Sequence, residues 1–400
     1  MKPSNYLKPY IPFSPPHLGD EEFTEVLDTL RSDWITTGPK VKKFEKEFAQ
    51  AIGAPEALAV NSGTDAMLVG LATLGIGRGD EVITTPMTFC STVHVIEHLG
   101  AKPVLVDVEP DTLNISPELV ARAITPRTRA IMPVHLYGHP CEMDSLLEIA
   151  GQNGLSVVED AAHALPAVYK GRMIGTMGTF TSFSFYATKN LTTGEGGMLT
   201  GEPGLIEKAR LWSLHGMSRD AYKRYDTDGS WYYEVVLPGF KCNMTDIQAS
   251  LGLHQLKKLP AFQLRRREVV RTYNEAFSDF PEFELPVERP EVTSAWHLYV
   301  LRLNLDFLSI DRGIFIEELK KRKIGASVHF IPIHLHPYYR SKYNYMPEDF
   351  PVAYENYRKM LSLPLNPRLS DHDVERIIEA VTEIATIFRK KQWHWAGMTY

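Results

Sequence analysis

The sequence predicts an α/β protein in which a large domain, built on a mainly parallel sheet flanked by helices, precedes a smaller C-terminal α+β domain. The first observation is a regular alternation of β-rich runs with helical patterns through the first half of the chain. Such alternation is typical of βα units, which form parallel sheets covered on both faces. The second is a shorter set of strand and helix patterns after about residue 280. The third is the length, because 400 residues can build more than one core.

Helices are expected before the sheet begins. A proline-rich start predicts an extended arm up to Pro16. The next segment has the pattern of an amphipathic helix, with one apolar face made of Phe23, Val26, Leu27 and Leu30. A second helix is predicted over residues 41–52, and Gly53 is expected to end it.

Seven short β-rich runs predict the strands of the large sheet. They lie at residues 57–60, 81–84, 103–108, 129–134, 155–159, 179–185 and 197–200. Helical patterns separate most of these runs and cover residues 64–74, 91–99, 117–124 and 143–152. The order therefore predicts helices on both faces of one sheet.

The C-terminal part begins with a long helical pattern that starts near Thr245. Pro260 is expected to interrupt this helix, which then resumes through Phe277. Beyond it we predict strands at 297–303 and 326–331 and helices at 314–322 and 374–388. We therefore assign residues 1–250 to an N-terminal arm and the large domain, and residues 251–400 to the small domain.

Composition narrows the class of protein. A net charge of −6 and a pI near 6.2 argue against a nucleic-acid or membrane partner, and the run Arg265-Arg266-Arg267 is interpreted as a solvated helix face. Three separated cysteines predict neither a disulfide framework nor a zinc site. No apolar run resembles a signal peptide or a membrane span. These features predict a cytoplasmic protein.

The segment Asn61-Ser62-Gly63-Thr64-Asp65-Ala66 follows a predicted strand and opens a predicted helix. A helix N-terminus offers free N–H groups and partial positive charge, which suit a phosphate. Gly63 permits close approach of the backbone, and the Thr64 hydroxyl can add a hydrogen bond. The alternative is an ordinary capped helix, because Ser and Thr are preferred caps.

Two further segments place reactive side chains at the ends of predicted strands. Asp160 follows the run Val157-Val158-Glu159, at the sheet edge where α/β proteins bind ligands. A helix cap or an ion pair would explain Asp160 equally well. Lys189 follows Ser184 by five residues and precedes a glycine-rich turn. A lysine whose pKa is lowered attacks carbonyl groups, although a lone lysine beside a turn is more often a surface residue.

Together these parts fit pyridoxal 5′-phosphate (PLP). The cofactor has an aldehyde for a lysine, a phosphate for a helix N-terminus and a pyridine nitrogen for a carboxylate. Phe89 follows a predicted strand and could stack on the ring, or simply pack in the core.

At this point the sequence resembles a known family. Five phrases occur in the order and approximate spacing of the DegT/StrS nucleotide-sugar aminotransferases. They are Thr36-Thr37-Gly38-Pro39, Asn61 through Ala66, Glu159 through His163, Ser184 through Gly197, and Asn243 through Ala249. The resemblance covers roughly residues 10–390. It implies the PLP-transferase fold of type I, the fold of aspartate aminotransferase.

The resemblance also implies roles for individual residues. Lys189 would bind PLP as a Schiff base, Asp160 would pair with the ring nitrogen, and His163 would lie near the ring hydroxyl. Phe89 would stack on the ring. The phosphate would be held by Gly63, Thr64 and the backbone N–H of Asp65, by Ser184, and by Asn243 of a neighbouring subunit. Shared sites of this kind imply a homodimer.

The substrate side is predicted from Thr36, Tyr186 and the histidine-rich segment 328–339. This segment resembles the sugar-side wall of relatives that act at carbon 4 of UDP-linked keto sugars, with His329 facing the sugar or the cofactor. A metal site is the weaker interpretation of its three histidines, because no cysteine or carboxylate lies close in sequence.

The predicted reaction is transfer of an amino group from an amino acid, L-glutamate, to a nucleotide-linked keto sugar. The presence of Lys189 favours amino transfer over dehydration, which relatives with histidine at this position catalyse. Two alternatives stay open: a PLP aminotransferase for a non-sugar ketone such as a cyclitol, and a non-catalytic regulator with the same fold.

Overall fold

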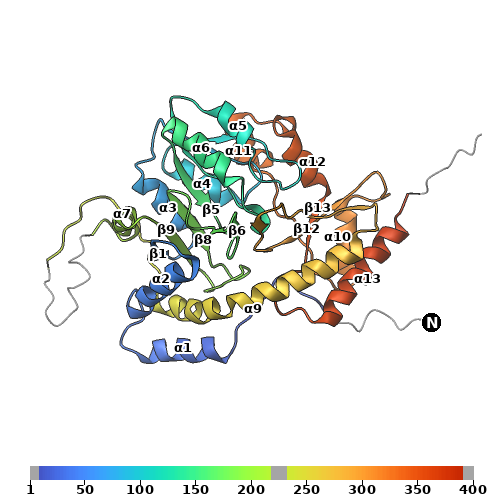
Figure 1. Cartoon of the computed structure of the whole chain (residues 1–400), viewed down its shortest axis with the longest axis horizontal. Helices are drawn as coiled ribbons and strands as arrows, with labels where there is room; N and C mark the ends of the chain where they lie inside the picture. The colour runs from blue at the N-terminus through green and yellow to red at the C-terminus, as the bar shows by residue number, and fades with distance from the viewer. Residues whose placement is uncertain (1–8, 218–231, 391–400) are drawn as a thin grey trace, which may run out of the picture.

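The computed structural model describes residues 9–217 and 232–390. Its N-terminal unit contains a seven-stranded sheet in the order β1-β9-β8-β5-β4-β2-β3 (Figure 1). Strands β8, β5, β4, β2 and β3 run parallel, and β9 is antiparallel to both of its neighbours. The strands are β1 (Glu56–Val60), β2 (Glu81–Thr84), β3 (Lys102–Leu105), β4 (Thr128–Ile131), β5 (Ser156–Asp160), β8 (Phe180–Ser184) and β9 (Gly197–Gly201). The predicted fold class and all seven predicted strands are confirmed.

Helices cover both faces of this sheet with separate apolar cores. One core includes residues of α2 (Pro39–Ile52), α5 (Pro117–Ala123), α6 (Met143–Asn153) and the first half of α9 (Asp246–Phe277). The other includes residues of α3 (Gly63–Thr73), α4 (Cys90–His98) and α7 (Pro203–Ser213). The sheet is therefore buried on both faces, as a parallel sheet requires.

Helix α1 (Asp20–Arg31) leaves most of its apolar face uncovered within this chain. Phe23, Leu27 and Leu30 are 52%, 49% and 53% exposed. Its polar residue Glu22 is instead buried, where it accepts hydrogen bonds from Gln255 and Lys258 of α9. The helix is thus attached through polar contacts, and its apolar face is available to another surface.

Helix α9 contradicts the predicted interruption at Pro260. The helix is continuous for 32 residues and passes beneath both units (Figure 1). A proline inside a helix removes one hydrogen bond. Here the flanking Leu259 and Phe262 are buried, so packing on both sides of the proline stabilises the helix.

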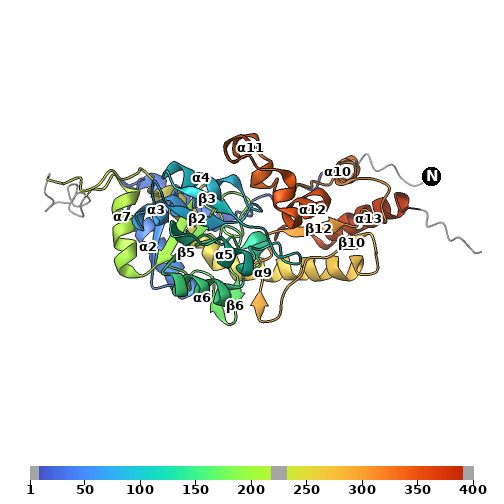
Figure 2. The same ribbon diagram turned by 90° about the horizontal axis from the view of Figure 1, so that it is seen from above.

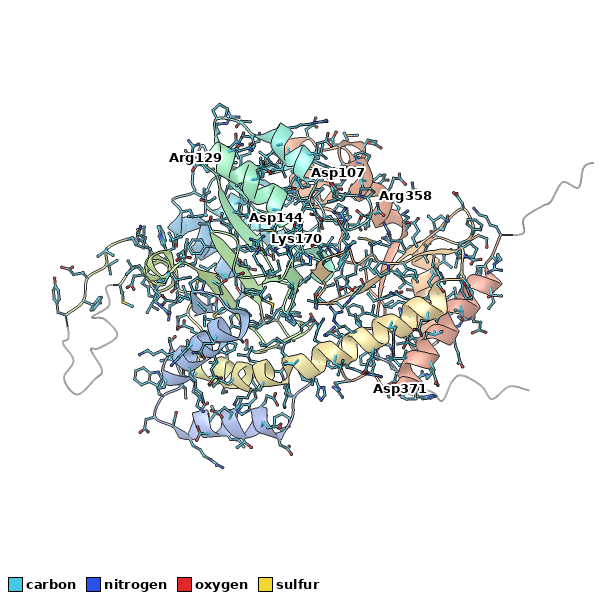
Figure 3. All side chains as sticks on the ribbon, viewed as in Figure 1. Asp107, Arg129, Asp144, Lys170, Arg358 and Asp371 are labelled. Carbon is cyan, nitrogen blue, oxygen red and sulfur yellow. The ribbon has the colours of Figure 1, made fainter. Side chains whose placement is uncertain are left out.

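The basic run on α9 is not simply a solvated face. Arg266 is buried and donates to the carbonyl oxygens of Trp296, His297 and Leu365. Burial lowers its pKa to about 9. Arg265 and Arg267 do pair with surface carboxylates, among them Asp371 at the start of α13 (Asp371–Ile387), labelled in Figure 3. The middle arginine therefore joins α9 to the C-terminal unit.

The C-terminal unit combines a small antiparallel sheet with helices. The sheet has the order β10-β12-β13, formed by Phe283–Glu284, Tyr299–Leu303 and Met360–Leu363. Beside it lie α10 (Arg312–Lys321), α12 (Pro351–Lys359) and α13, whereas Lys342 and Tyr343 of α11 (Pro337–Tyr343) bond to Glu97 of α4. A further small sheet, β11-β6-β7, joins Val292–Thr293 to the hairpin Val168–Tyr169 and Arg172–Met173.

The strand predicted at 326–331 is absent, which corrects the sequence interpretation. Ser327 forms one isolated bridge with Ser362 at the edge of β13. The chain then leaves the sheet, since Phe330 stacks near His163 of the N-terminal unit. Pro332 also lacks the N–H that a continuing strand would need. The irregular segment therefore connects the two units instead of extending the small sheet.

Several contacts hold the two units side by side (Figure 2). Asp107, just after β3, accepts hydrogen bonds from the backbone N–H groups of Val352 and Ala353 at the start of α12 (Figure 3). Ile11 of the arm pairs with Ile324 and belongs to the apolar core of the C-terminal unit. The arm thus packs on the C-terminal unit, although α2, the second helix after it, packs on the large sheet.

Candidate active site

A cavity of about 530 Å³ opens at the carboxyl edge of the large sheet and is closed on one side by the C-terminal unit. This volume lies in the range of sites for small molecules and cofactors. Most of the residues predicted from the sequence line it: Gly63, Thr64, Phe89, Asp160, His163, Ser184, Tyr186, Lys189 and His329.

Strand register brings these residues together. Asp160 at the end of β5 pairs with Ser182 of β8, so both strands end at the same edge. Val60 of β1 and Ser184 of β8 each pair with Gly197, from opposite sides of β9. The start of α3, which follows β1, therefore lies beside the end of β8. One edge collects groups that are up to 128 residues apart in sequence, from Asn61 to Lys189.

The start of α3 forms a close-fitting cradle with the end of β8. A Cβ atom on Gly63 would lie 2.8 Å from the Ser184 Cβ and 3.2 Å from its Cα. Only glycine permits this approach without a shift. The Ser62 hydroxyl caps the helix by accepting from the Asp65 N–H at 3.0 Å. Free N–H groups at the helix start and the Ser184 hydroxyl together suit an anion such as phosphate.

Asp160 presents a fixed carboxylate to the cavity. Its Oδ1 accepts a hydrogen bond from the Ala162 N–H at 3.1 Å, and its Oδ2 accepts one from the Thr92 hydroxyl at 2.7 Å. Each oxygen keeps a further lone pair. The carboxylate is therefore ready to pair with a cationic ring nitrogen.

Lys189 lies in a turn that its neighbour Asn190 holds in place. The Asn190 amide donates to the carbonyl oxygens of Leu165 and Ala295, at 2.9 and 2.8 Å. No side chain among the described residues bonds to the Lys189 amine. Burial lowers the pKa of Lys189 to about 8, while the negative charge of Asp160 opposes the shift. An amine with this pKa is partly neutral near physiological pH, and therefore nucleophilic.

Three histidines surround the lysine, and all are held neutral. Burial, with added repulsion from Lys189, lowers the pKa of His163 and His297 well below the usual value and that of His329 to about 4. His163 Nδ1 accepts the Tyr137 N–H at 3.2 Å, so its proton is on Nε2. His163 is thus a neutral hydrogen-bond donor in the cavity.

Phe89 is 55% exposed within this chain, at the start of α4. Its ring lies 5.7 Å from that of Phe330 and is tilted to it. A large aromatic ring that stays exposed in a cavity is suited to stacking on a planar ligand. Core packing, the alternative interpretation, does not describe this ring.

Three predicted site residues do not line the cavity of this chain. Thr36 is exposed, and its carbonyl oxygen accepts the Asp246 N–H. The Asp65 N–H, which the resemblance places at the phosphate, donates instead to the Ser62 hydroxyl, and the Asp65 carboxylate accepts from that hydroxyl as part of the helix cap. Asn243 donates to the Thr37 hydroxyl at 2.6 Å and contacts Lys241.

The sequence interpretation missed other residues that line the cavity or support it. Thr88, Glu195, His297 and Phe330 line it, whereas Thr92 and Asn190 act from behind it. Asn190 and Glu195 lie within the phrase Ser184 through Gly197, whereas Thr88, Thr92, His297 and Phe330 lie outside the quoted phrases. Their roles come from long-range contacts, such as the 3.1 Å bond between His297 Nδ1 and Asn190 Oδ1.

Metal binding finds no support in the part of the chain that the structure describes. No group of three or more His, Cys, Asp or Glu side chains there could hold a metal ion. His334, in the histidine-rich segment, is buried against Phe350, and His329 bonds to Ser362. These histidines are used in packing and in the cavity wall.

The donor set fits PLP. One cavity is surrounded by a lysine amine of lowered pKa for the aldehyde, a carboxylate for the ring nitrogen, an exposed aromatic ring and a helix start beside a hydroxyl. In this α/β architecture they define a PLP-dependent transferase of fold type I.

The comparisons with known proteins agree. A model described as the DegT/DnrJ/EryC1/StrS aminotransferase family matches residues 16–382, and the chain belongs to this family. A relative in Bacillus subtilis, the spore coat polysaccharide biosynthesis protein SpsC, is 52% identical over 377 residues, which cover 94% of this chain and 97% of SpsC.

Solved structures extend the agreement to the cofactor. Spr1654 of Streptococcus pneumoniae, in its PLP form, has a TM-score of 0.88 and 37% identity, covering 94% of this chain and 99% of its own. Helicobacter pylori PseC, an aminotransferase involved in the biosynthesis of pseudoaminic acid, has a TM-score of 0.87 and 30% identity, covering 95% and 100%. The predicted class, a PLP-dependent aminotransferase, is confirmed.

Proposed function

We propose that this enzyme transfers the amino group of L-glutamate to a nucleotide-linked keto sugar, at carbon 4 of a UDP-linked 4-keto sugar. The observation that carries the proposal is the partly neutral Lys189 amine in one cavity with Asp160 and the start of α3. Such a site supports both halves of an amino transfer, first from the amino acid and then to the ketone.

The residues divide the chemical work. When bound, PLP supplies an aldehyde for the lysine and a ring that accepts the electrons of a carbanion. Lys189 Nζ would take the proton from the amino-bearing carbon of the donor and return it as general acid. Asp160 would pair with the protonated ring nitrogen, and Phe89 would restrain the ring by stacking. His163 donates through Nε2 to an oxygen of the ligand.

The sugar substrate is supported by relatives and by the wall of the cavity. SpsC belongs to polysaccharide biosynthesis by name, PseC to the biosynthesis of pseudoaminic acid, and Spr1654 is named provisionally as a sugar aminotransferase. Tyr186 and His329 line the cavity and offer a hydroxyl and an imidazole. Polar groups of this kind suit the hydroxyls of a sugar.

A homodimer with shared sites forms part of the proposal. Asn243 lies outside the cavity of its own chain, so a role at the phosphate requires a second subunit. The exposed apolar face of α1 supports such an interface, because apolar surface of this extent is typically covered by a partner.

Mixing two inactive variants tests this arrangement. Lys189→Ala and Asn243→Ala homodimers are mixed, allowed to exchange subunits and assayed. If Asn243 acts across the interface, each mixed dimer has one site with both intact groups, and activity rises. No gain after exchange, verified by differently tagged subunits, contradicts the shared site.

We also place the enzyme in the cytoplasm, where nucleotide sugars serve as substrates for biosynthesis. Among the described residues, no helix has the length and apolar character that a membrane crossing requires. Cell fractionation followed by immunoblotting tests the location, and recovery in the membrane or secreted fraction contradicts it.

The substrate is tested by direct competition. The purified enzyme is assayed with L-glutamate and either a UDP-linked 4-keto sugar or a keto-cyclitol, and 2-oxoglutarate and the aminated product are measured. We expect kcat/KM for the nucleotide sugar to be higher by about 100-fold or more, because polar sites reject ligands that leave their groups unpaired. Initial-rate lines should be parallel, as for ping-pong kinetics. Preference for the cyclitol, or binding without turnover, contradicts the proposal.

A further inference from the structure

Thr92 lies directly behind Asp160 and is fully buried on the first turns of α4. Its hydroxyl donates to Asp160 Oδ2 at 2.7 Å and lies 2.7 Å from the Thr88 hydroxyl. Thr92 does not line the cavity, whereas Thr88 and Asp160 do. The threonine therefore does not touch a ligand in the cavity itself, and its hydroxyl connects two residues that do line it, Asp160 and Thr88.

The chemistry of the three groups fixes the direction of these hydrogen bonds. An ionised carboxylate only accepts, so the single hydroxyl proton of Thr92 points to Asp160. The Thr92 oxygen is then free to accept, and Thr88 must be the donor to it. The result is a chain of donors, Thr88 to Thr92 to Asp160, that ends on the carboxylate oxygen.

We infer that Thr92 is a positioning residue for the cofactor's ring nitrogen: it fixes the Asp160 carboxylate in the rotamer that pairs with the ring. The Ala162 N–H restrains Oδ1 from the backbone of the loop, and Thr92 restrains Oδ2 from α4. Two anchors on different elements prevent rotation of the carboxylate. The inference rests on the role proposed above for Asp160.

Hydroxyl burial alone offers a different explanation. A buried threonine needs some hydrogen-bond partner, and Asp160 could simply satisfy it. The two explanations differ in what loss of the hydroxyl changes. Loss of a hydroxyl that is merely satisfied in the core lowers the stability of the protein. Loss of a positioning hydroxyl lowers PLP affinity and the rate of the half-reaction, and only while the Asp160 carboxylate is present.

The test is a double-mutant cycle on the apoprotein and the loaded enzyme. Thr92→Val removes the hydroxyl with almost no change of shape, Thr92→Ser retains it, and Asp160→Asn removes the charge. PLP affinity is measured by titration of the apoprotein, the first half-reaction by the loss of visible absorbance on adding L-glutamate, and folding by thermal unfolding of each apoprotein.

We expect Thr92→Val to weaken PLP binding and slow the half-reaction by about 10-fold each, in line with a hydrogen bond to a charged group. Thr92→Ser should stay within about twofold of wild type. In the Asp160→Asn background, Thr92→Val should add almost nothing, because coupled residues are not additive.

The outcomes separate this inference from the proposed function. If Asp160→Asn leaves both readouts unchanged, the role of Asp160 fails and the inference fails with it. If Asp160→Asn has a large effect but Thr92→Val alone changes neither readout, only the inference is overturned. The same holds if Thr92→Val causes the same fold-loss in the Asp160→Asn background as in the wild type. A variant whose only change is a lower unfolding temperature also overturns it.

Discussion

The floor and the outer wall of the cavity are built in different ways. The floor consists of residues 62–64, Asp160, Ser184 and Lys189, which follow strands of the large sheet. The outer wall is formed by His329 and Phe330, in a segment that contains no strand. This segment contacts the small sheet through the bridge at Ser327 and the hydrogen bond between His329 and Ser362. Strand register fixes the floor, whereas isolated contacts position the wall, such as the backbone hydrogen bond from the Ile333 N–H to the Pro86 carbonyl oxygen at 2.8 Å.

This difference suggests a division of labour. The floor holds the groups that we propose bind PLP and move the proton, and such groups need a rigid geometry. The outer wall is fastened by separate contacts, such as Phe13 stacked on His329 at 5.2 Å and Ser362 bonded to His329 at 2.9 Å. A wall of this kind can change with the substrate while the floor stays the same. Four experiments test the division.

Lys189→Ala should have the largest effect. Loss of the amine removes both the covalent partner of PLP and the general base, so we expect kcat for the overall transfer to fall by at least about 1,000-fold. The assay measures 2-oxoglutarate formed from L-glutamate at saturating PLP. Activity within tenfold of wild type would show that another group moves the proton.

Gly63→Ala should weaken the floor without touching a reactive group. The added Cβ would lie 2.8 Å from Ser184 Cβ, so the start of α3 has to move away from β8. We expect the dissociation constant of PLP to rise by about 10-fold or more, because the anion donors separate. Gly151→Ala on α6 is the matched control, since open space surrounds that position. Equal PLP affinity in both variants would disprove the cradle.

His329→Asn should affect the wall and spare the floor. The imidazole lines the cavity, so we expect kcat/KM for the keto sugar to fall by about 10-fold, the scale of a lost hydrogen bond to the substrate. PLP affinity and the half-reaction with L-glutamate should stay within about twofold. His372→Asn on the exposed face of α13 is the control. An equal loss in both half-reactions would contradict the division of labour.

The pH dependence of PLP capture should show the smallest effect. Only the neutral amine of Lys189 reacts with an aldehyde, so capture by the apoprotein should rise with pH through a midpoint near 8, well below the ordinary lysine value of 10.5. Asp160 favours the charged lysine, so Asp160→Asn should move the midpoint to lower pH, by less than about one unit. Stopped-flow absorbance measures the rates, and an upward movement would contradict the assigned sign.

The same contrast explains what the sequence revealed. Floor residues follow strands whose alternation with helices is visible in the sequence, and short motifs such as Ser62-Gly63-Thr64 mark them. The alternation of strands and helices therefore predicted the sheet, and the short motifs predicted most of the residues that line the cavity. The wall was predicted as a strand because its residues are apolar and β-prone, but contacts with the other unit determine its course.

Supporting residues were invisible for a related reason. Thr92, Asn190 and His297 act through partners that lie 68, 25 and 107 residues away along the chain. No local pattern encodes such pairs. Pro260 was misjudged because packing against two cores outweighs the local preference of one residue.

The most direct test is the absorbance of the PLP-loaded protein on mixing with L-glutamate alone, recorded for wild type, Lys189→Ala and His329→Asn. The division of labour predicts that wild type and His329→Asn lose the visible band at similar rates and release one 2-oxoglutarate per site, while Lys189→Ala keeps a visible band and releases no 2-oxoglutarate. Conversion of Lys189→Ala at the wild-type rate, or failure of His329→Asn, would contradict the assignment of amino-group chemistry to the floor.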